Sequence, residues 1–140
     1  MQMRLNNYIT ISVCIIINDQ DELLTVRKQG SAYYQLPGGK IEEGERPVDS
    51  LIRELNEELD LVLSEEDCKL IGVHEAQAVN EEGKTVRGYV FQSKVSQSWN
   101  ELKPHAELKE VRWVNKSEIE EVPLANLLKQ FALPIWVGIK

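Results

Sequence analysis

The chain has 140 residues and a formal net charge of −7, and 42% of its residues are hydrophobic. This length is typical of one domain, so we expect residues 1–140 to fold as a single unit around an apolar core. An acidic chain without a basic stripe is not expected to bind a nucleic-acid duplex, which requires clustered Lys and Arg. No apolar run approaches the roughly 20 residues of a membrane helix, so we expect no membrane partner. The two cysteines, Cys14 and Cys68, predict buried free thiols in a reducing cytoplasm.

The N-terminal part of the sequence predicts a hairpin, a loop and a helix. Residues 8–18 are rich in Ile and Val and favour a buried strand, and residues 22–28 favour the returning strand after a polar turn. The proline and two glycines within residues 35–39 are expected to interrupt regular structure. A helix is predicted from Pro47, because apolar residues follow at steps of three and four, namely Val48, Leu51, Ile52, Leu55 and Leu59.

The C-terminal part predicts a second hairpin, a loop, a short strand and a second helix. The hairpin arms are residues 72–79 and 85–93, which flank a polar turn. Residues 99–109 carry charges and a proline with little periodicity and favour a loop, and residues 111–115 favour a strand. A helix is predicted over residues 124–131, where four large apolar side chains share one face. Strands mixed with two separated helices indicate an α+β fold or an α/β/α sandwich, and the topology stays open.

The first predicted helix carries three carboxylates on its polar side. Glu54 precedes Glu57 by three residues and Glu58 by four, so the three side chains project from one patch. Like charges at this spacing destabilise a helix by roughly a few tenths of a kcal/mol per pair, and one interpretation is a solvated acidic face. The other interpretation is a cation site, because Mg²⁺ binds through one or two carboxylates together with water and substrate phosphates.

These carboxylates belong to a longer pattern. Residues 39–61 resemble the Nudix box, G-x5-E-x7-R-E-U-x-E-E-x-G-U with U aliphatic, and read Gly39-x5-Glu45-x7-Arg53-Glu54-Leu55-x-Glu57-Glu58-x-Asp60-Leu61. Asp60 alone departs, since the family has glycine there to end the helix in a left-handed conformation. Asp adopts this conformation less readily, so we expect a loss of stability and retained activity. Residues 36–40 and 110–114 also resemble Nudix domains, and the resemblance implies a Nudix-type α/β/α sandwich with a mixed sheet.

The resemblance also implies a chemistry, the hydrolysis of a nucleoside diphosphate linked to another moiety, with Mg²⁺ or Mn²⁺ as cofactor. One of the box carboxylates could take the proton from the attacking water. Arg53 and Glu45 are expected to pair and hold the loop against the helix, the alternative for Arg53 being an ordinary surface cation. Matched position by position, the expected metal ligands are Glu54, Glu57, Glu58 and the carbonyl of Gly39.

Candidate substrate contacts lie outside this segment. Arg27 and Lys28 end the second predicted strand and Lys40 follows the glycine pair, which makes all three candidates for phosphate contacts or simply solvated charges. Residues 123–126, Pro-Leu-Ala-Asn, resemble the P-x-A-N segment of mutator-type nucleoside triphosphatases, in which the Asn amide contacts an oxidised guanine. Such an amide donates and accepts at once, whereas an Asn at a helix start often serves only as a cap, which is the alternative for Asn126. Aromatic residues could stack on a base or fill the core, namely Phe91, Tyr89, Tyr33 and Tyr34.

The sequence therefore favours a Nudix pyrophosphohydrolase that converts (d)NTPs, oxidised forms included, to (d)NMP and pyrophosphate. ADP-ribose or another nucleoside diphosphate sugar is the alternative substrate. A non-catalytic nucleotide sensor is the alternative of a different class, and the full carboxylate set disfavours it, because a sensor needs no hydrolytic cluster. The expected partner is a nucleotide, and the oligomeric state stays open, with a homodimer as one option.

Overall fold

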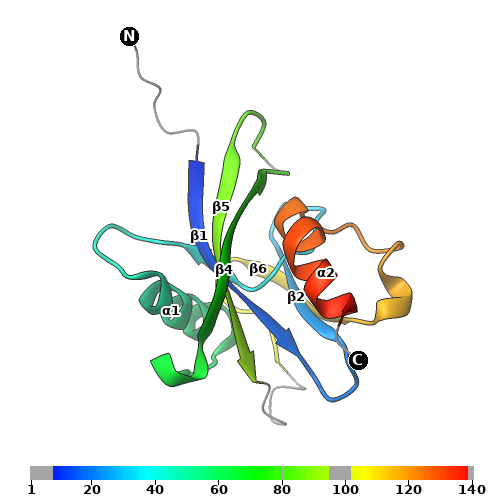
Figure 1. Ribbon diagram of the computed structural model, residues 1–140, viewed down its shortest axis with the longest axis horizontal. Coiled ribbons are helices and arrows are strands. Elements are labelled where there is room, and N and C mark those ends of the chain that lie inside the picture. Colours follow the sequence, from blue (N-terminus) through cyan, green and yellow to red (C-terminus); the bar gives the residue numbers. More distant parts are fainter. Residues whose placement is uncertain (1–7, 80, 95–101, 139–140) are drawn as a thin grey trace.

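A mixed sheet of six strands forms the centre of the computed structural model, which describes residues 8–79, 81–94 and 102–138 (Figure 1). The strand order is β4-β5-β1-β2-β6, and β3 pairs with β1 beside β2. β1 and β5 run parallel, whereas β1–β2, β1–β3, β2–β6 and β4–β5 are antiparallel pairs. The strands are β1 Tyr8–Ile17, β2 Leu23–Lys28, β3 Gly38–Lys40, β4 Lys69–Gln77, β5 Thr85–Lys94 and β6 Leu108–Val114.

Helices cover both faces of the sheet, which confirms the expected α/β/α sandwich (Figure 1). Along β1, Val13 and Ile15 face the core under the C-terminal helix, whereas Cys14 and Ile16 face the core under α1, because successive strand side chains point to opposite faces. None of the helices in the described part of the chain is long and apolar enough to cross a membrane. The helical elements are α1 Pro47–Leu59, the 3₁₀ turns η1 Glu65–Asp67 and η3 Lys116–Glu118, the π-helical turn η4 Leu128–Ala132 and α2 Leu133–Val137.

The glycine pair lies in a short strand, which corrects the expected interruption at residues 35–39. β3 pairs antiparallel with residues 11–13 of β1. Gly38 has a φ of 143°, and a Cβ there would overlap the backbone of Ser12 and Val13. Only glycine permits both this φ and this close approach of two strands, and the approach is a long-range contact that local composition does not reveal. β3 thus fixes the start of the Nudix-like segment, residues 39–61, against the central strand.

Hydrogen bonds from the sheet fix the N-terminus of α1. Ser12 Oγ donates to the carbonyl of Pro47 at 2.7 Å, and Ser50 Oγ donates to the carbonyl of Lys40 at 3.2 Å. Pro47 opens the helix, where its missing N–H needs no partner. The apolar face packs on the sheet through fully buried Leu51 and Leu55, as the spacing predicts. The polar face of α1 is therefore held beside β3.

The C-terminus of α1 is closed by Asp60 in the expected left-handed conformation. Its φ is 58° and its ψ is 32°, and its N–H donates to the carbonyl of Asn56 at 3.0 Å. Asp60 itself is exposed. The backbone therefore behaves at this position as a glycine would, at the higher conformational cost of a side chain.

Asp60→Gly is expected to raise the free energy of unfolding by about 0.5–1 kcal/mol, because glycine adopts the left-handed conformation without a Cβ penalty. Activity should change less than about tenfold, since Asp60 does not line the cavity described below. Urea unfolding measures the first effect and kcat/KM the second. Asp60→Asn is the matched control, because it removes the charge and keeps a side chain. A large change in metal affinity in both variants, at unchanged stability, would show that the charge acts on the site instead.

The last strand begins earlier than the sequence predicts. β6 starts at Leu108, inside the loop expected over residues 99–109, because Leu108 pairs with Lys28 at the end of β2. Residues 99–101 of that loop lie outside the described residues. The part of the loop that is described, residues 102–107, approaches the end of α1.

The C-terminal helix is shifted relative to its predicted range of 124–131. Leu124 forms a parallel bridge with Tyr34, so the helix begins only at residue 126. It then continues to Val137 through the π-helical turn η4, in which the N–H of Leu133 donates to the carbonyl of Leu128. Pro134, which lacks an N–H, is accommodated immediately after this turn.

Both cysteines are free thiols, as expected. Cys14 is fully buried, and burial raises the pKa of its thiol well above the usual value. Cys68 is only partly buried, which corrects the expectation that both are buried. The reason is its position between η1 and β4, the edge strand of the sheet.

Candidate active site

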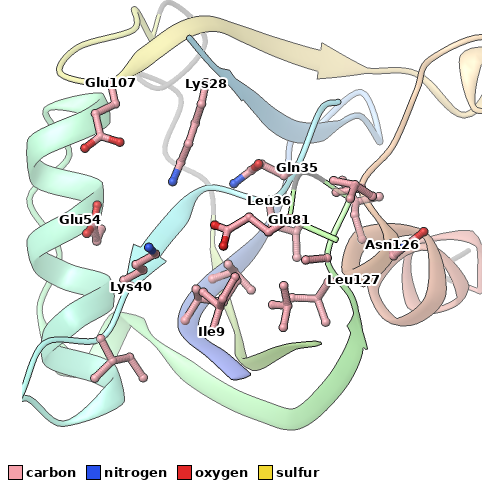
Figure 2. Close-up of a pocket in the computed structure, with 18 of the residues that line it drawn as sticks. Ile9, Lys28, Gln35, Leu36, Lys40, Glu54, Glu81, Glu107, Asn126 and Leu127 are labelled. Carbon is pink, nitrogen blue, oxygen red and sulfur yellow. The ribbon is translucent and has the colours of Figure 1, made fainter. Parts of the chain in front are cut away.

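A cavity of about 630 Å³ is lined by residues from α1, β3, the β4–β5 hairpin and the start of the C-terminal helix. Figure 2 shows Glu54 and Glu107 on one wall, Asn126 and Leu127 on the opposite wall, and Lys28 and Lys40 reaching into the cavity near the carboxylates. The wall around Leu127 is aliphatic, with Ile9, Ile11 and Val86. The cavity thus joins a charged end to an apolar end.

Glu58 places a buried carboxylate at the charged end. Only 3% of its surface is exposed, and its Oε1 has no hydrogen-bond partner among the described residues. Burial raises the pKa of Glu58 to about 8; the Lys28 charge opposes this shift, and the charges of Glu54 and Glu107 add to it. A buried carboxylate oxygen without a donor is costly, so this position suits a bound cation.

Glu54, one helical turn before Glu58, faces Gly39 of β3. A Cβ at residue 39 would overlap the Glu54 carboxylate, so glycine leaves the space that this carboxylate occupies. Burial raises the pKa of Glu54, and Arg53 acts against the shift with its Nη1 3.1 Å from Glu54 Oε2. Glu54 and Gly39 therefore meet at the junction of α1 and β3.

Glu57 lies beside Glu54, and both carboxylates contact the same Arg53 Nη1. The Glu57 side chain is 52% exposed and its Oε1 lies 3.5 Å from Arg53 Nη1. Because successive helical residues turn by about 100°, positions 57, 54 and 58 fall within an arc of about 100° on one side of α1. The charge of Glu57 accordingly adds to the raised pKa of both Glu54 and Glu58. Within the described residues, no three His, Cys, Asp or Glu side chains are gathered as a ready-made metal site.

Arg53 and Glu45 form the expected pair. Arg53 Nε donates to Glu45 Oε2 at 2.7 Å and Nη2 donates to Oε1 at 3.0 Å, a two-point contact. Arg53 Nη2 also donates to the carbonyl of Lys40 at 3.2 Å, which ties α1 to β3. Hydrogen bonding to Arg53 lowers the pKa of Glu45 to about 2. Arg53 is therefore not a free surface cation.

Of the three basic candidates, two reach the cavity. Lys28 and Lys40 line it, whereas Arg27 does not. Arg27 Nε donates to Glu110 at 3.1 Å and its Nη1 donates to the carbonyl of Ser31 at 3.0 Å. The strand register shifts between Arg27 and Lys28, so the direction of each side chain follows from its own contacts and not from regular alternation. The prediction that Arg27 contacts a phosphate in this cavity is therefore not supported.

Asn126 lines the cavity, but its amide is partly committed. Its Nδ2 donates to the carbonyl of Gln77 at 2.8 Å, which ties the C-terminal helix to β4. The side chain therefore bridges two elements, whereas the alternative from the sequence was a helix cap. No described residue donates to its Oδ1. The aromatic candidates for base stacking are all absent from the cavity wall, whose described residues include no Phe, Tyr or Trp.

Three carboxylates that were not among the sequence candidates also line the cavity, namely Glu42, Glu81 and Glu107. Glu107 lies in the loop before β6, where the N–H of His105 donates to the carbonyl of Glu58 at 2.9 Å and brings the loop onto α1. The length and charge of that loop were the signal available in the sequence. Glu81 lies in the β4–β5 turn, and nothing in a generic polar turn marks it as a site residue.

The oxygen donors at the charged end fit a divalent cation. The orphaned Oε1 of Glu58 and the Glu54 carboxylate beside Gly39 are hard oxygen ligands of the kind that Mg²⁺ and Mn²⁺ take in proteins. Glu57 lies outside this pair and would have to turn from Arg53 to join it.

Known proteins resemble the chain in sequence over part of its length. It is 42% identical over 53 residues to 8-oxo-dGTP diphosphatase of Escherichia coli (strain K12), covering 35% of this chain and 41% of that protein. It is 43% identical over 47 residues to RNA pyrophosphohydrolase of Ruthia magnifica subsp. Calyptogena magnifica, covering 34% of this chain and 26% of that protein. The chain thus aligns with less than half the length of each of these relatives.

Solved structures share the fold over nearly the whole chain. The MutT protein from Methanosarcina mazei Go1 superposes with a TM-score of 0.74 and 21% identity, covering 96% of both chains. A bifunctional NMN adenylyltransferase/ADP ribose pyrophosphatase from Francisella tularensis, complexed with AMP and Mn ion, superposes at 0.75 with 20% identity, covering 96% of this chain and 42% of that one. The sequence pattern of the NUDIX domain matches residues 8–133, from the start of β1 to the first residue of α2, and the chain therefore belongs to the NUDIX domain family.

Proposed function

We propose that this protein is a pyrophosphohydrolase that cleaves (d)NTPs, oxidised forms included, to (d)NMP and pyrophosphate. The observation that carries the proposal is the cavity that joins a charged end to an aliphatic end. A nucleotide likewise joins a charged part, its phosphates, to an uncharged part, its nucleoside. The relative named 8-oxo-dGTP diphosphatase supports a nucleoside triphosphate as substrate.

Glu54 and Glu58, with the carbonyl of Gly39, would hold the Mg²⁺ or Mn²⁺ ion, and Glu57 would complete the set after leaving Arg53. The ion, when bound, would offset phosphate charge and make a nearby water more acidic. Support comes from the buried, unpaired Oε1 of Glu58 and from the space that Gly39 leaves for Glu54.

The remaining residues orient the substrate and accept the proton. Lys28 and Lys40 line the cavity next to the carboxylates and would bind the substrate phosphates. Water attacks one phosphorus of the pyrophosphate bridge, the bridging P–O bond breaks, and the proton passes to an exposed carboxylate, Glu57 or Glu107. The Arg53–Glu45 pair positions α1 against β3 without touching the substrate.

The test is a substrate panel in Mg²⁺ with product identification. dGTP, its 8-oxo form, CTP and ADP-ribose are compared by kcat/KM, and ¹⁸O water identifies the attacked phosphorus. We expect monophosphate and pyrophosphate from triphosphates, and loss of turnover in EDTA. A preference for ADP-ribose would overturn the triphosphate assignment and keep the carboxylate assignment. Nucleotide binding without turnover of any compound would indicate a sensor.

A further inference from the structure

Glu81 is a cavity carboxylate that has no role in the hydrolytic proposal. It lies in the turn between β4 and β5, and Figure 2 shows it between the wall with Glu54 and the wall with Asn126. The turn is held by hydrogen bonds from the N–H of Lys84 to the carbonyl of Glu81 at 3.1 Å and from the N–H of Ala78 to the carbonyl of Lys84 at 2.9 Å. The side chain is exposed, and its carboxylate has no hydrogen bond or ion pair within the described residues.

The surroundings of Glu81 suit the base rather than the phosphates. Val79 and Val86 of the same hairpin line the cavity with aliphatic side chains, whereas Glu54 and Glu58 come from α1. Lys28 and Lys40 lie near the carboxylates of α1, so a nucleotide with its phosphates there would present its neutral base to the hairpin. Glu81 then accepts hydrogen bonds and donates none.

Asn126 reinforces this preference for donors. Because its Nδ2 is engaged by the carbonyl of Gln77, its Oδ1 is the part of the amide left for a ligand. Both Glu81 and Asn126 therefore offer acceptors to the base. Gln35, which also lines the cavity, carries an amide that can donate or accept and so discriminates less.

We propose that Glu81 is a specificity-determining residue that selects guanine, an inference that rests on the proposed function. Guanine carries a ring N–H beside an amino group, and the two oxygens of one carboxylate can accept from both. Adenine and cytosine place a ring acceptor beside their amino group, and thymine flanks its N–H with carbonyls, so each would repel one oxygen of Glu81. A site built for donors rejects analogues that lack them.

The experiment compares dGTP with dITP, whose base differs only by the missing amino group. The protein is expected to prefer dGTP by about tenfold or more in kcat/KM, and Glu81→Gln should reduce the preference to within about twofold because it lowers dGTP hydrolysis more than dITP hydrolysis. Glu82→Gln is the matched control, because Glu82 is exposed in the same turn and does not line the cavity, and it should keep the preference.

Binding of dGMP and dIMP, measured by calorimetry, separates this inference from the proposed function. If no triphosphate is hydrolysed but dGMP binds more tightly than dIMP and Glu81→Gln abolishes the difference, the hydrolytic function fails and the role of Glu81 stands. If Glu81→Gln slows dGTP and dITP equally, or shifts the Mg²⁺ requirement, Glu81 acts on the phosphates or the cation and the inference is overturned.

Discussion

Glu58→Gln is expected to lower kcat by about 10³–10⁵-fold, the largest effect on activity of any single change proposed here. The amide has nearly the same volume but no charge for a cation, so the fold should survive. Steady-state hydrolysis in saturating Mg²⁺ measures the loss. Glu66→Gln is the control, since Glu66 is exposed in η1 and outside the cavity. Turnover close to that of the parent protein would show that Glu58 is not needed for the reaction.

The same substitution should stabilise the protein when metal is withheld. The pKa of Glu58 is about 8 in the folded protein and near 4.5 in the unfolded chain. The stability that comes from protonated Glu58 is therefore fully present below pH 4.5 and is lost as the pH rises through 8. The parent protein should thus lose stability between pH 4.5 and pH 8, whereas Glu58→Gln should not, because glutamine does not ionise. At pH 8 in EDTA we expect Glu58→Gln to melt higher by about 3–8 °C, or about 1–2 kcal/mol. An equal difference at pH 4.5 and pH 8 would mean that ionisation of Glu58 is not the cause.

Gly38→Ala is expected to cost about 3 kcal/mol or more of unfolding free energy and to lower the Tm by about 10 °C. Two effects combine, since the φ of 143° disfavours a side chain and the new Cβ would overlap the backbone of Ser12 and Val13. Thermal unfolding followed by circular dichroism measures the change.

Gly44→Ala separates these two effects. Gly44 also has a positive φ, 86°, but a Cβ there would have no atom within 4 Å. It should lose only about 1–2 kcal/mol, the conformational part alone. Equal losses in the two variants would mean that the contact between β3 and β1 yields to an added methyl group.

Features that depend on short-range spacing could be predicted from the amino-acid sequence. The α1 helix follows from apolar steps of three and four, and its left-handed end follows from the place of Asp60 in the Nudix-like segment. The Arg53–Glu45 pair also follows from that segment, because both partners lie within it. Each of these depends on residues less than about three helical turns apart, where backbone geometry largely fixes the outcome.

Contacts between distant segments could not be predicted in this way. Arg27 is turned to Glu110 on β6, and the amide of Asn126 is engaged by β4, contacts between segments far apart in the chain. Glu81 and Glu107 line the cavity because the fold brings the β4–β5 hairpin and the loop before β6 next to α1 and β3. Spacing along the chain does not encode such long-range contacts, which depend on strand order and register. The charged end of the cavity could therefore be predicted from the sequence, whereas of the opposite end the sequence predicted only Asn126.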